Sequence, residues 1–183
     1  MSRAFVSESD GEFQDDDLPA IKIPLPANTK NYMTPEGAEK LKSELHHLMH
    51  TERPAIAAAL SRQVSGVDSA DQQTIGLSRR RLREVERRIE YLNVMVGRLE
   101  VVETAGQDRQ QVTFGAAVTV ADEKETTKFY RIVGVDESEP EAGRISWISP
   151  LARALIGAKA GEVVTVELPE HEVTLRILEI DYP

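Results

Sequence analysis

The stretch Arg81-Leu-Arg-Glu-Val-Glu-Arg-Arg-Ile-Glu-Tyr-Leu92 decides the fold, because its apolar residues recur at helical spacing. The pattern extends on the C-terminal side at alternating steps of three and four, and its full set is Leu82, Val85, Ile89, Leu92, Val96 and Leu99. Such a heptad seam predicts a helix whose apolar side is covered by a partner helix. We expect this helix to run from about Ser78 to near Glu103.

A partner helix is predicted upstream, where Leu41, Leu45 and Leu48 begin a similar stripe. Thr34 and Pro35 suit the N-cap and the first helical position, so the helix should start there and run to about Gln63. Pro54 lies inside it and predicts a kink, because proline removes one hydrogen bond of the helix.

Between the two predicted helices lies a short polar break, Ser65-Gly66-Val67-Asp68-Ser69-Ala70-Asp71. A short connection between long helices favours an antiparallel return. We therefore expect a long antiparallel helical hairpin, a coiled coil over residues 32–106, with its tip near residues 65–73.

The hydrophobic pattern changes after residue 110. Alternating apolar residues predict strands over 112–120, 127–135 and 144–148, and a last hairpin over 162–168 and 172–180. Ser149 and Pro150 predict the start of a short helix that continues to Leu155. Residues 110–183 thus predict a compact antiparallel sheet domain with one short helix, so the expected fold class is α+β.

Residues 1–31 combine a run of acidic residues with three prolines, and they predict a disordered tail. Two interpretations stay open for it. It is either a solvated extension, or an acidic arm that contacts a basic partner surface or masks this chain's own arginines.

The composition limits which kinds of protein and binding site are compatible with this chain. The formal net charge is −9, which argues against binding nucleic acid through bulk charge, although a local basic surface remains compatible with it. The chain has no cysteine, which excludes disulfides and thiolate zinc sites and fits a reducing cytoplasm. No apolar run approaches the ~20 residues that span a membrane, so we expect a cytoplasmic protein without a membrane segment.

Several separate motifs are similar to a known family. Three motifs resemble the two helices of bacterial GreA/GreB transcript-cleavage factors: Tyr32-Met-Thr-Pro-Glu-Gly-Ala-Glu-Lys-Leu-Lys-Ser-Glu-Leu45, Glu52-Arg-Pro54 and the Arg81–Leu92 stretch. The Arg81–Leu92 stretch resembles the GreB branch especially. Three further motifs match the C-terminal domain of that family in order and spacing: Phe114-Gly-Ala116, Arg131-Ile-Val-Gly-Val-Asp-Glu137 and Ile148-Ser-Pro-Leu-Ala-Arg-Ala-Leu155.

The resemblance implies a fold and a partner. It implies an FKBP-like C-terminal domain that docks on RNA polymerase, and a coiled coil that enters the secondary channel of the polymerase. Asp68 and Asp71 fall at the family's two acidic tip positions. The resemblance gives them the role of holding a magnesium ion shared with the polymerase active site, where backtracked RNA is cleaved. The chain would then bind no cofactor alone, act as a monomer, and stimulate a partner's activity without being an enzyme itself.

The tip also departs from the family pattern. The family has glutamate at the second acidic position, where this chain has Asp71, and an aromatic residue of the usual tip is absent here. Two functions therefore stay open: a factor that stimulates cleavage of backtracked RNA, and a non-catalytic channel binder that regulates or inhibits the polymerase. Peptidyl-prolyl isomerase activity is a weaker third candidate that rests on the fold analogy alone.

Two further sets of residues are candidates for binding. Arg79, Arg80, Arg81 and Arg83 would contact the phosphates of the RNA 3′ end, because the guanidinium group matches phosphate geometry; the alternative is a solvated helix face with ion pairs to nearby glutamates. The segment with Ser149, Pro150, Leu151 and Arg153 resembles the docking element for the polymerase; the alternative is a plain helix start.

Overall fold

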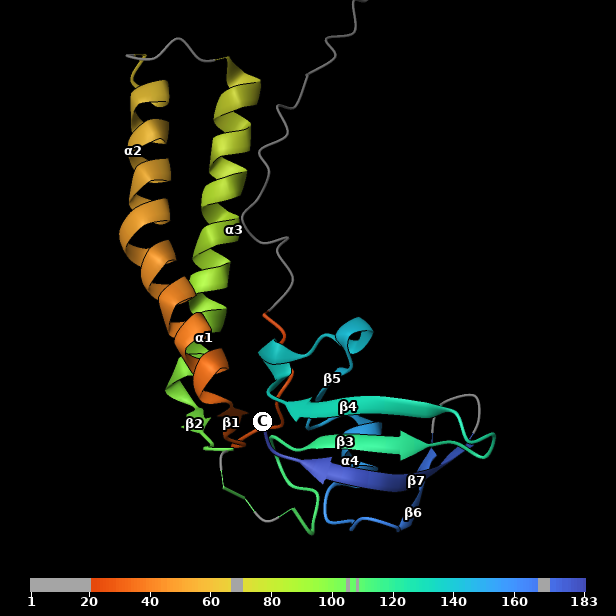
Figure 1. Ribbon diagram of the computed structural model, residues 1–183. Coiled ribbons are helices and arrows are strands. Elements are labelled where there is room, and N and C mark those ends of the chain that lie inside the picture. The colour runs from red at the N-terminus through yellow and green to blue at the C-terminus, as the bar shows by residue number, and fades with distance from the viewer. Residues whose placement is uncertain (1–20, 67–70, 105, 108, 168–171) are drawn as a thin grey trace, which may run out of the picture.

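The computed structural model describes residues 21–66, 71–104, 106–107, 109–167 and 172–183. Two long helical segments stand side by side and project away from a small sheet (Figure 1). The predicted α+β class is confirmed at this level. Residues 1–20 of the predicted tail, and Asp68 at the predicted tip, lie outside the described residues.

The first helical segment comprises α1 (Pro35–His47), a π-helical turn η2 (Leu48–Glu52) and α2 (Arg53–Val64). Thr34 caps α1 as predicted, and its hydroxyl accepts a hydrogen bond from the Gly37 amide at 3.1 Å. Pro54 lies in the first turn of α2 and has no amide hydrogen to donate to the preceding turn. The regular α-helical pattern is accordingly replaced by the π turn just before Pro54.

The second segment is a single helix, α3 (Gln72–Gly97), which differs from the prediction at both ends. It begins before Ser78 because Asp71 caps it, and Gly76 is accommodated inside it. It ends at Gly97, so the prediction that the helix continues to Glu103 was wrong. Residues 99–101 instead form β2 (Leu99–Val101), which pairs in parallel with β1 (Asn31–Met33) at the base of the hairpin.

The two helical segments share one apolar core and several ion pairs. Arg88 contacts Glu44 at 2.7 Å, Arg53 contacts Glu86 at 2.9 Å, and Arg81 contacts Glu52 at 2.5 Å. Glu44, early in the first segment, thus pairs further along α3 than Glu52 and Arg53 do. The core beneath these pairs consists of Leu25, Met33, Ala38, Leu41, Leu48, Val85, Leu92 and Met95.

The second domain is a five-stranded sheet in the order β5-β4-β3-β7-β6, formed by β3 (Ala117–Ala121), β4 (Thr127–Val133), β5 (Arg144–Ser146), β6 (Val163–Glu167) and β7 (Glu172–Asp181). Its neighbouring strands are antiparallel except β4 and β5, which run parallel. The prediction of an antiparallel sheet was therefore wrong for this pair. The chain crosses over between them through two short turns, η3 (Val135–Glu137) and η4 (Pro140–Ala142), and strand patterns alone do not reveal such a crossover.

The core of the sheet domain lies between the sheet and the short helix α4 (Pro150–Leu155). The turn between β3 and β4 is built around Asp122, whose carboxylate accepts from the amides of Lys124 and Thr126, both at 2.9 Å. The first predicted strand is shorter than expected, because Val112 is buried in a loop and regular pairing starts only at Ala117.

Within residues 21–31, which the sequence assigns to the tail, several side chains pack against the hairpin. Leu25 is only 6% exposed, and Ile23 also packs on the core of the helical segments. Asn31 lies in β1 and is fully buried. The folded region therefore begins several residues before the predicted boundary. Among the described residues, no helix is both long enough and apolar enough to cross a membrane.

Candidate functional site at the hairpin tip and the domain junction

The far end of the helical pair presents one described carboxylate, that of Asp71. Asp71 has extended backbone angles and caps α3, and its carboxylate accepts from the Thr74 amide at 2.7 Å. Its side chain is exposed to solvent. The hydrogen bonds from the backbone and the hydroxyl of Thr74 lower the pKa of Asp71, so the group is ionised at neutral pH.

The structure thus gives Asp71 a local role in addition to any role at a metal. An aspartate at this position satisfies one of the unpaired amides at the start of a helix, and its negative charge is favourable there. Within the described part of the chain, no three histidine, aspartate or glutamate side chains gather as a metal site. Asp71 fits magnesium as a single oxygen ligand, so a complete coordination sphere would need ligands from a partner.

The four candidate arginines lie on the first half of α3 and divide into two kinds. Arg80 pairs with Glu84 at 3.1 Å, and Arg81 pairs with Glu52 on the opposite segment at 2.5 Å. Arg79 and Arg83 have no ion pair with the residues that the structure describes. They lie eight and twelve positions after Asp71, which is about 12 and 18 Å along a helix at ~1.5 Å per residue. Of the four candidates, Arg79 and Arg83 are therefore the two whose guanidinium groups are not engaged in an ion pair with the described residues.

The candidate docking segment is a short capped helix on the sheet domain. The Ser149 hydroxyl accepts from the Ala152 amide at 3.1 Å, and Pro150 occupies the first turn, so the capping role is observed. Leu151 packs against the core of the sheet domain, while the Arg153 side chain is exposed. Ser149 and Leu151 are thus used in folding, and Pro150 and Arg153 face solvent.

A third cluster, which the sequence did not reveal, joins the hairpin to the sheet domain. The Glu137 carboxylate in η3 accepts from the Thr34 amide at 3.0 Å and from the Thr34 hydroxyl, 103 residues away along the chain. The adjacent Asp136 accepts from the Tyr91 hydroxyl at 2.7 Å. We call these four residues the domain junction. No local motif signals them, because each contact joins two distant segments.

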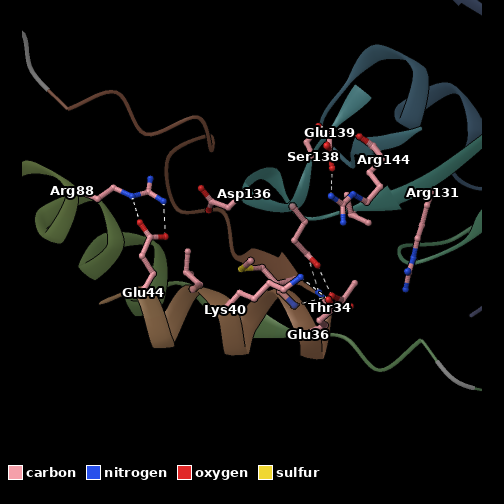
Figure 2. Close-up of a pocket in the computed structure, with 15 residues that line it drawn as sticks. Thr34, Glu36, Lys40, Glu44, Arg88, Arg131, Asp136, Ser138, Glu139 and Arg144 are labelled. Carbon is pink, nitrogen blue, oxygen red and sulfur yellow. Dashed lines mark hydrogen bonds and ion pairs between the residues drawn. The ribbon is translucent and has the colours of Figure 1, made fainter. Parts of the chain in front are cut away.

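A cavity of about 300 Å³ lies beside the domain junction, between α1 and the β4–β5 crossover (Figure 2). Its charged side chains are mostly paired with one another: Lys40 with Glu36 at 2.6 Å, Arg88 with Glu44 at 2.7 Å, and Arg144 with Glu139. The lining contains more carboxylates than cations, so the cavity offers no net positive charge for an anion.

Comparison with known proteins decides the family. The family model described as transcription elongation factor, N-terminal, matches residues 31–101, and the model described as transcription elongation factor GreA/GreB, C-term, matches residues 107–182. The chain belongs to the GreA/GreB family of transcription elongation factors. The resemblance expected from the sequence motifs is confirmed.

Two relatives, both named transcription elongation factor GreB, agree with this GreA/GreB assignment. Transcription elongation factor GreB of Yersinia pestis is 40% identical over 152 residues, which cover 83% of this chain and 89% of that protein. GreB of Neisseria meningitidis serogroup B is 36% identical over 159 residues, covering 86% and 98%. Among solved structures, GreA factor homolog 1 of Thermus thermophilus superposes with a TM-score of 0.40 at 20% identity, covering 83% and 99%.

The matched regions of the GreA/GreB family contain every candidate residue. The N-terminal region includes Asp68, Asp71 and the four arginines, and the C-terminal region includes Glu137 and α4. The packed residues 21–30 precede both regions, so they are outside what the family models describe.

Proposed function

We propose that this GreA/GreB protein binds RNA polymerase and stimulates endonucleolytic cleavage of backtracked RNA, which rescues arrested elongation complexes. The sheet domain, in this proposal an FKBP-like fold, docks on the polymerase through the exposed side of α4. The antiparallel coiled coil enters the secondary channel. The factor acts as a monomer in the cytoplasm, and the catalytic site belongs to the polymerase.

The observation that carries the proposal is an ionised carboxylate at the far end of a long, narrow pair of helices. The first segment spans residues 35–64, about 45 Å at ~1.5 Å per residue, and Asp71 follows at its end. Such a shape delivers a tip to a buried place that the sheet domain could not enter. Asp71 has no described catalytic partner in its own chain, so its chemistry would be completed elsewhere.

The residues of this chain would then act in three ways. Asp71, together with Asp68, offers carboxylate oxygens to a magnesium ion shared with the polymerase, and such an ion supplies activation of water and stabilisation of the leaving 3′ oxygen. Arg79 and Arg83 contact phosphates of the RNA 3′ segment. Pro150 and Arg153 contact the polymerase surface.

A second candidate is a non-catalytic channel binder that regulates or inhibits the polymerase. The specific observation in its favour is that the Asp71 carboxylate already caps α3, at 2.7 Å from the Thr74 amide. A carboxylate held by its own helix has less freedom to turn toward a metal ion, and its side chain is one methylene shorter than the glutamate of the family pattern.

The test uses a stalled, backtracked elongation complex with the purified protein, and follows the length of the RNA. Asp71→Asn is the decisive variant, because asparagine caps a helix as well as aspartate but has no charge for a metal ion. We expect the wild type to shorten the RNA, and Asp71→Asn and Asp68→Asn each to lower the rate by about 10²-fold.

A competition measurement separates the two candidates. If the wild type leaves the RNA intact but displaces a known secondary-channel binder, the non-catalytic function stands and the cleavage function fails. If Asp71→Asn cleaves as fast as the wild type while Asp71→Ala does not, Asp71 acts only as a helix cap.

A further inference from the structure

We propose that Glu137 is a positioning residue that fixes the direction of the helical hairpin relative to the sheet domain. Asp136 assists it by holding the second helix. The consequence for RNA cleavage rests on the proposed function, whereas the effect on hairpin direction can be measured on the protein alone.

The contacts of Glu137 lie where the hairpin begins. One carboxylate oxygen accepts from the Thr34 amide and from the Gly134 amide, both at 3.0 Å, and the other accepts from the Thr34 hydroxyl. Thr34 is the N-cap of α1 and is buried. The negative charge of Glu137 therefore lies at the positive end of α1, where it is electrostatically favourable.

Two glycines leave space for this carboxylate. A Cβ atom at Gly37 would lie 2.2 Å from the carboxyl carbon of Glu137, and one at Gly134 would lie 2.6 Å from its oxygen. Neither contact is sterically possible without displacing Glu137. Both glycines thus leave space for this side chain, and Gly134 also leaves space for the Tyr32 carbonyl oxygen, which would lie 2.7 Å from a Cβ atom there.

The neighbouring Asp136 holds the other helix of the hairpin. It accepts from the Tyr91 hydroxyl on α3 at 2.7 Å, and the Arg88 guanidinium lies over the Tyr91 ring at 5.1 Å. Arg88 in turn reaches Glu44 on α1, as Figure 2 shows, through hydrogen bonds of 2.7 and 2.8 Å. Two consecutive carboxylates of one short turn therefore contact both helices of the hairpin.

The length of the hairpin makes this junction important. A residue such as Ser61 lies 27 positions after Thr34, about 40 Å away along the helical segment at ~1.5 Å per residue. A rotation of about 10° at the junction would then move it by roughly 7 Å, on the same helical rise. Misplacement by only ~1 Å can cost about 10²-fold in rate. Stiffness at the junction is therefore needed to place the tip.

The first experiment measures the hairpin direction without the polymerase. The chain has no cysteine, so spin labels can be placed at Ser61→Cys on α2 and Lys128→Cys on β4, two exposed positions. We expect a narrow distribution of label distances in this background. Glu137→Ala should broaden or shift it by several ångströms, and Glu137→Gln, which keeps one acceptor oxygen, should give an intermediate result.

Matched variants control for loss of folding. Tyr91→Phe keeps the aromatic ring and removes only the hydroxyl that donates to Asp136, so it should broaden the distribution with little effect on helix content. Glu141→Gln changes an exposed carboxylate on the same crossover and should leave the distribution unchanged. If Glu137→Ala and Tyr91→Phe both keep the distance distribution of the wild type, the proposal is wrong.

The second experiment measures cleavage of backtracked RNA as a function of factor concentration. A positioning role predicts that Glu137→Ala lowers the maximal rate by about 10-fold or more and leaves the half-saturating concentration unchanged, because docking is intact. A broadened distance distribution with an unchanged maximal rate would overturn the positioning role. If the wild type itself does not stimulate cleavage, the proposed function fails, and the distance measurement still decides the role of Glu137.

Discussion

Asp71 is both the N-cap of α3 and the described carboxylate of the tip. The pH dependence of stability reports on its capping role alone. Its pKa is lowered by the hydrogen bonds from Thr74, so its contribution to stability is present above the ordinary pKa that an aspartate has in the unfolded chain, and is lost as pH falls through the lower pKa of the folded state. We expect Asp71→Asn to match the wild type in thermal stability at pH 7 and to lose less stability on acidification.

Thermal unfolding followed by circular dichroism at pH 7 and pH 3 measures this difference. Asp71→Ala is the control, because it removes the cap at both pH values and should lower the melting temperature even at pH 7. Equal melting temperatures for the wild type and Asp71→Ala at pH 7 would contradict a capping role.

Two glycines on helices should respond in opposite ways to the same substitution. Gly37→Ala places a Cβ atom 2.2 Å from the Glu137 carboxyl carbon, whereas a Cβ at Gly76 meets no atom within 4 Å. Alanine is a better helix former than glycine by ~1 kcal/mol. We therefore expect Gly76→Ala to raise the free energy of unfolding by ~0.5–1 kcal/mol and Gly37→Ala to lower it. Chemical denaturation of both variants measures the two signs, and stabilisation by Gly37→Ala would show that Glu137 is not held as described.

At the scale of the helices, the apolar seam should matter more for stability than the ion pairs above it. Leu92 is 0% exposed, while Arg88 and Glu44 are partly exposed to solvent. We expect Leu92→Ala to cost ~2–5 kcal/mol and Glu44→Ala to cost ~1 kcal/mol or less. Denaturant unfolding at low and high salt tests this, since the cost of Glu44→Ala should shrink with salt and that of Leu92→Ala should not.

The helical hairpin is also where the sequence was most informative. Repeated apolar residues predict helices well, and the caps at Thr34 and Ser149 were identified because their signals are local. The end of α3 was missed because Leu99 continues the heptad spacing although it lies in β2. Only the pairing of β2 with β1, more than sixty residues upstream, decides that Leu99 is a strand residue.

The same limit explains what was missed at the site. The tip residues and the four arginines could be named from motifs. Which of the arginines already form ion pairs depends on the opposite helical segment, because that segment supplies partners such as Glu52 for Arg81. The domain junction was not found at all, because Thr34 and Glu137 are 103 residues apart. The direction of β5 likewise depends on a crossover that no strand pattern encodes.

At the scale of the whole molecule, residues before the family's matched region contribute to packing between the domains. Leu25 is 6% exposed, in a cluster that Val135 and Trp147 of the sheet domain also contact. We expect Leu25→Ala to lower the free energy of unfolding by ~2–3 kcal/mol. Leu77, which is 61% exposed on α3, gives the matched control, and Leu77→Ala should change stability by less than ~0.5 kcal/mol.

The fluorescence of Trp147 offers a direct measurement of this packing. It is the only tryptophan of the chain, and it packs against Tyr32 with ring centroids 5.3 Å apart. Leu25→Ala should shift its emission toward longer wavelength at denaturant concentrations where helix content is still retained. Emission that changes only together with helix content would show that Leu25 does not support the contact between the domains.

The parallel pairing of β1 with β2 has a consequence for how such proteins diversify. The chain enters the hairpin after Met33 and returns from it at Leu99, and these two points belong to neighbouring strands of one small parallel ladder, with Asn31 opposite Leu99 and Met33 opposite Val101. The helical hairpin is therefore an insertion whose two ends are held in adjacent, paired strands. A hairpin from a related factor could therefore be grafted at this base without changing the path of the chain through the sheet domain. Hairpins with altered tips could be exchanged in the same way, as whole units.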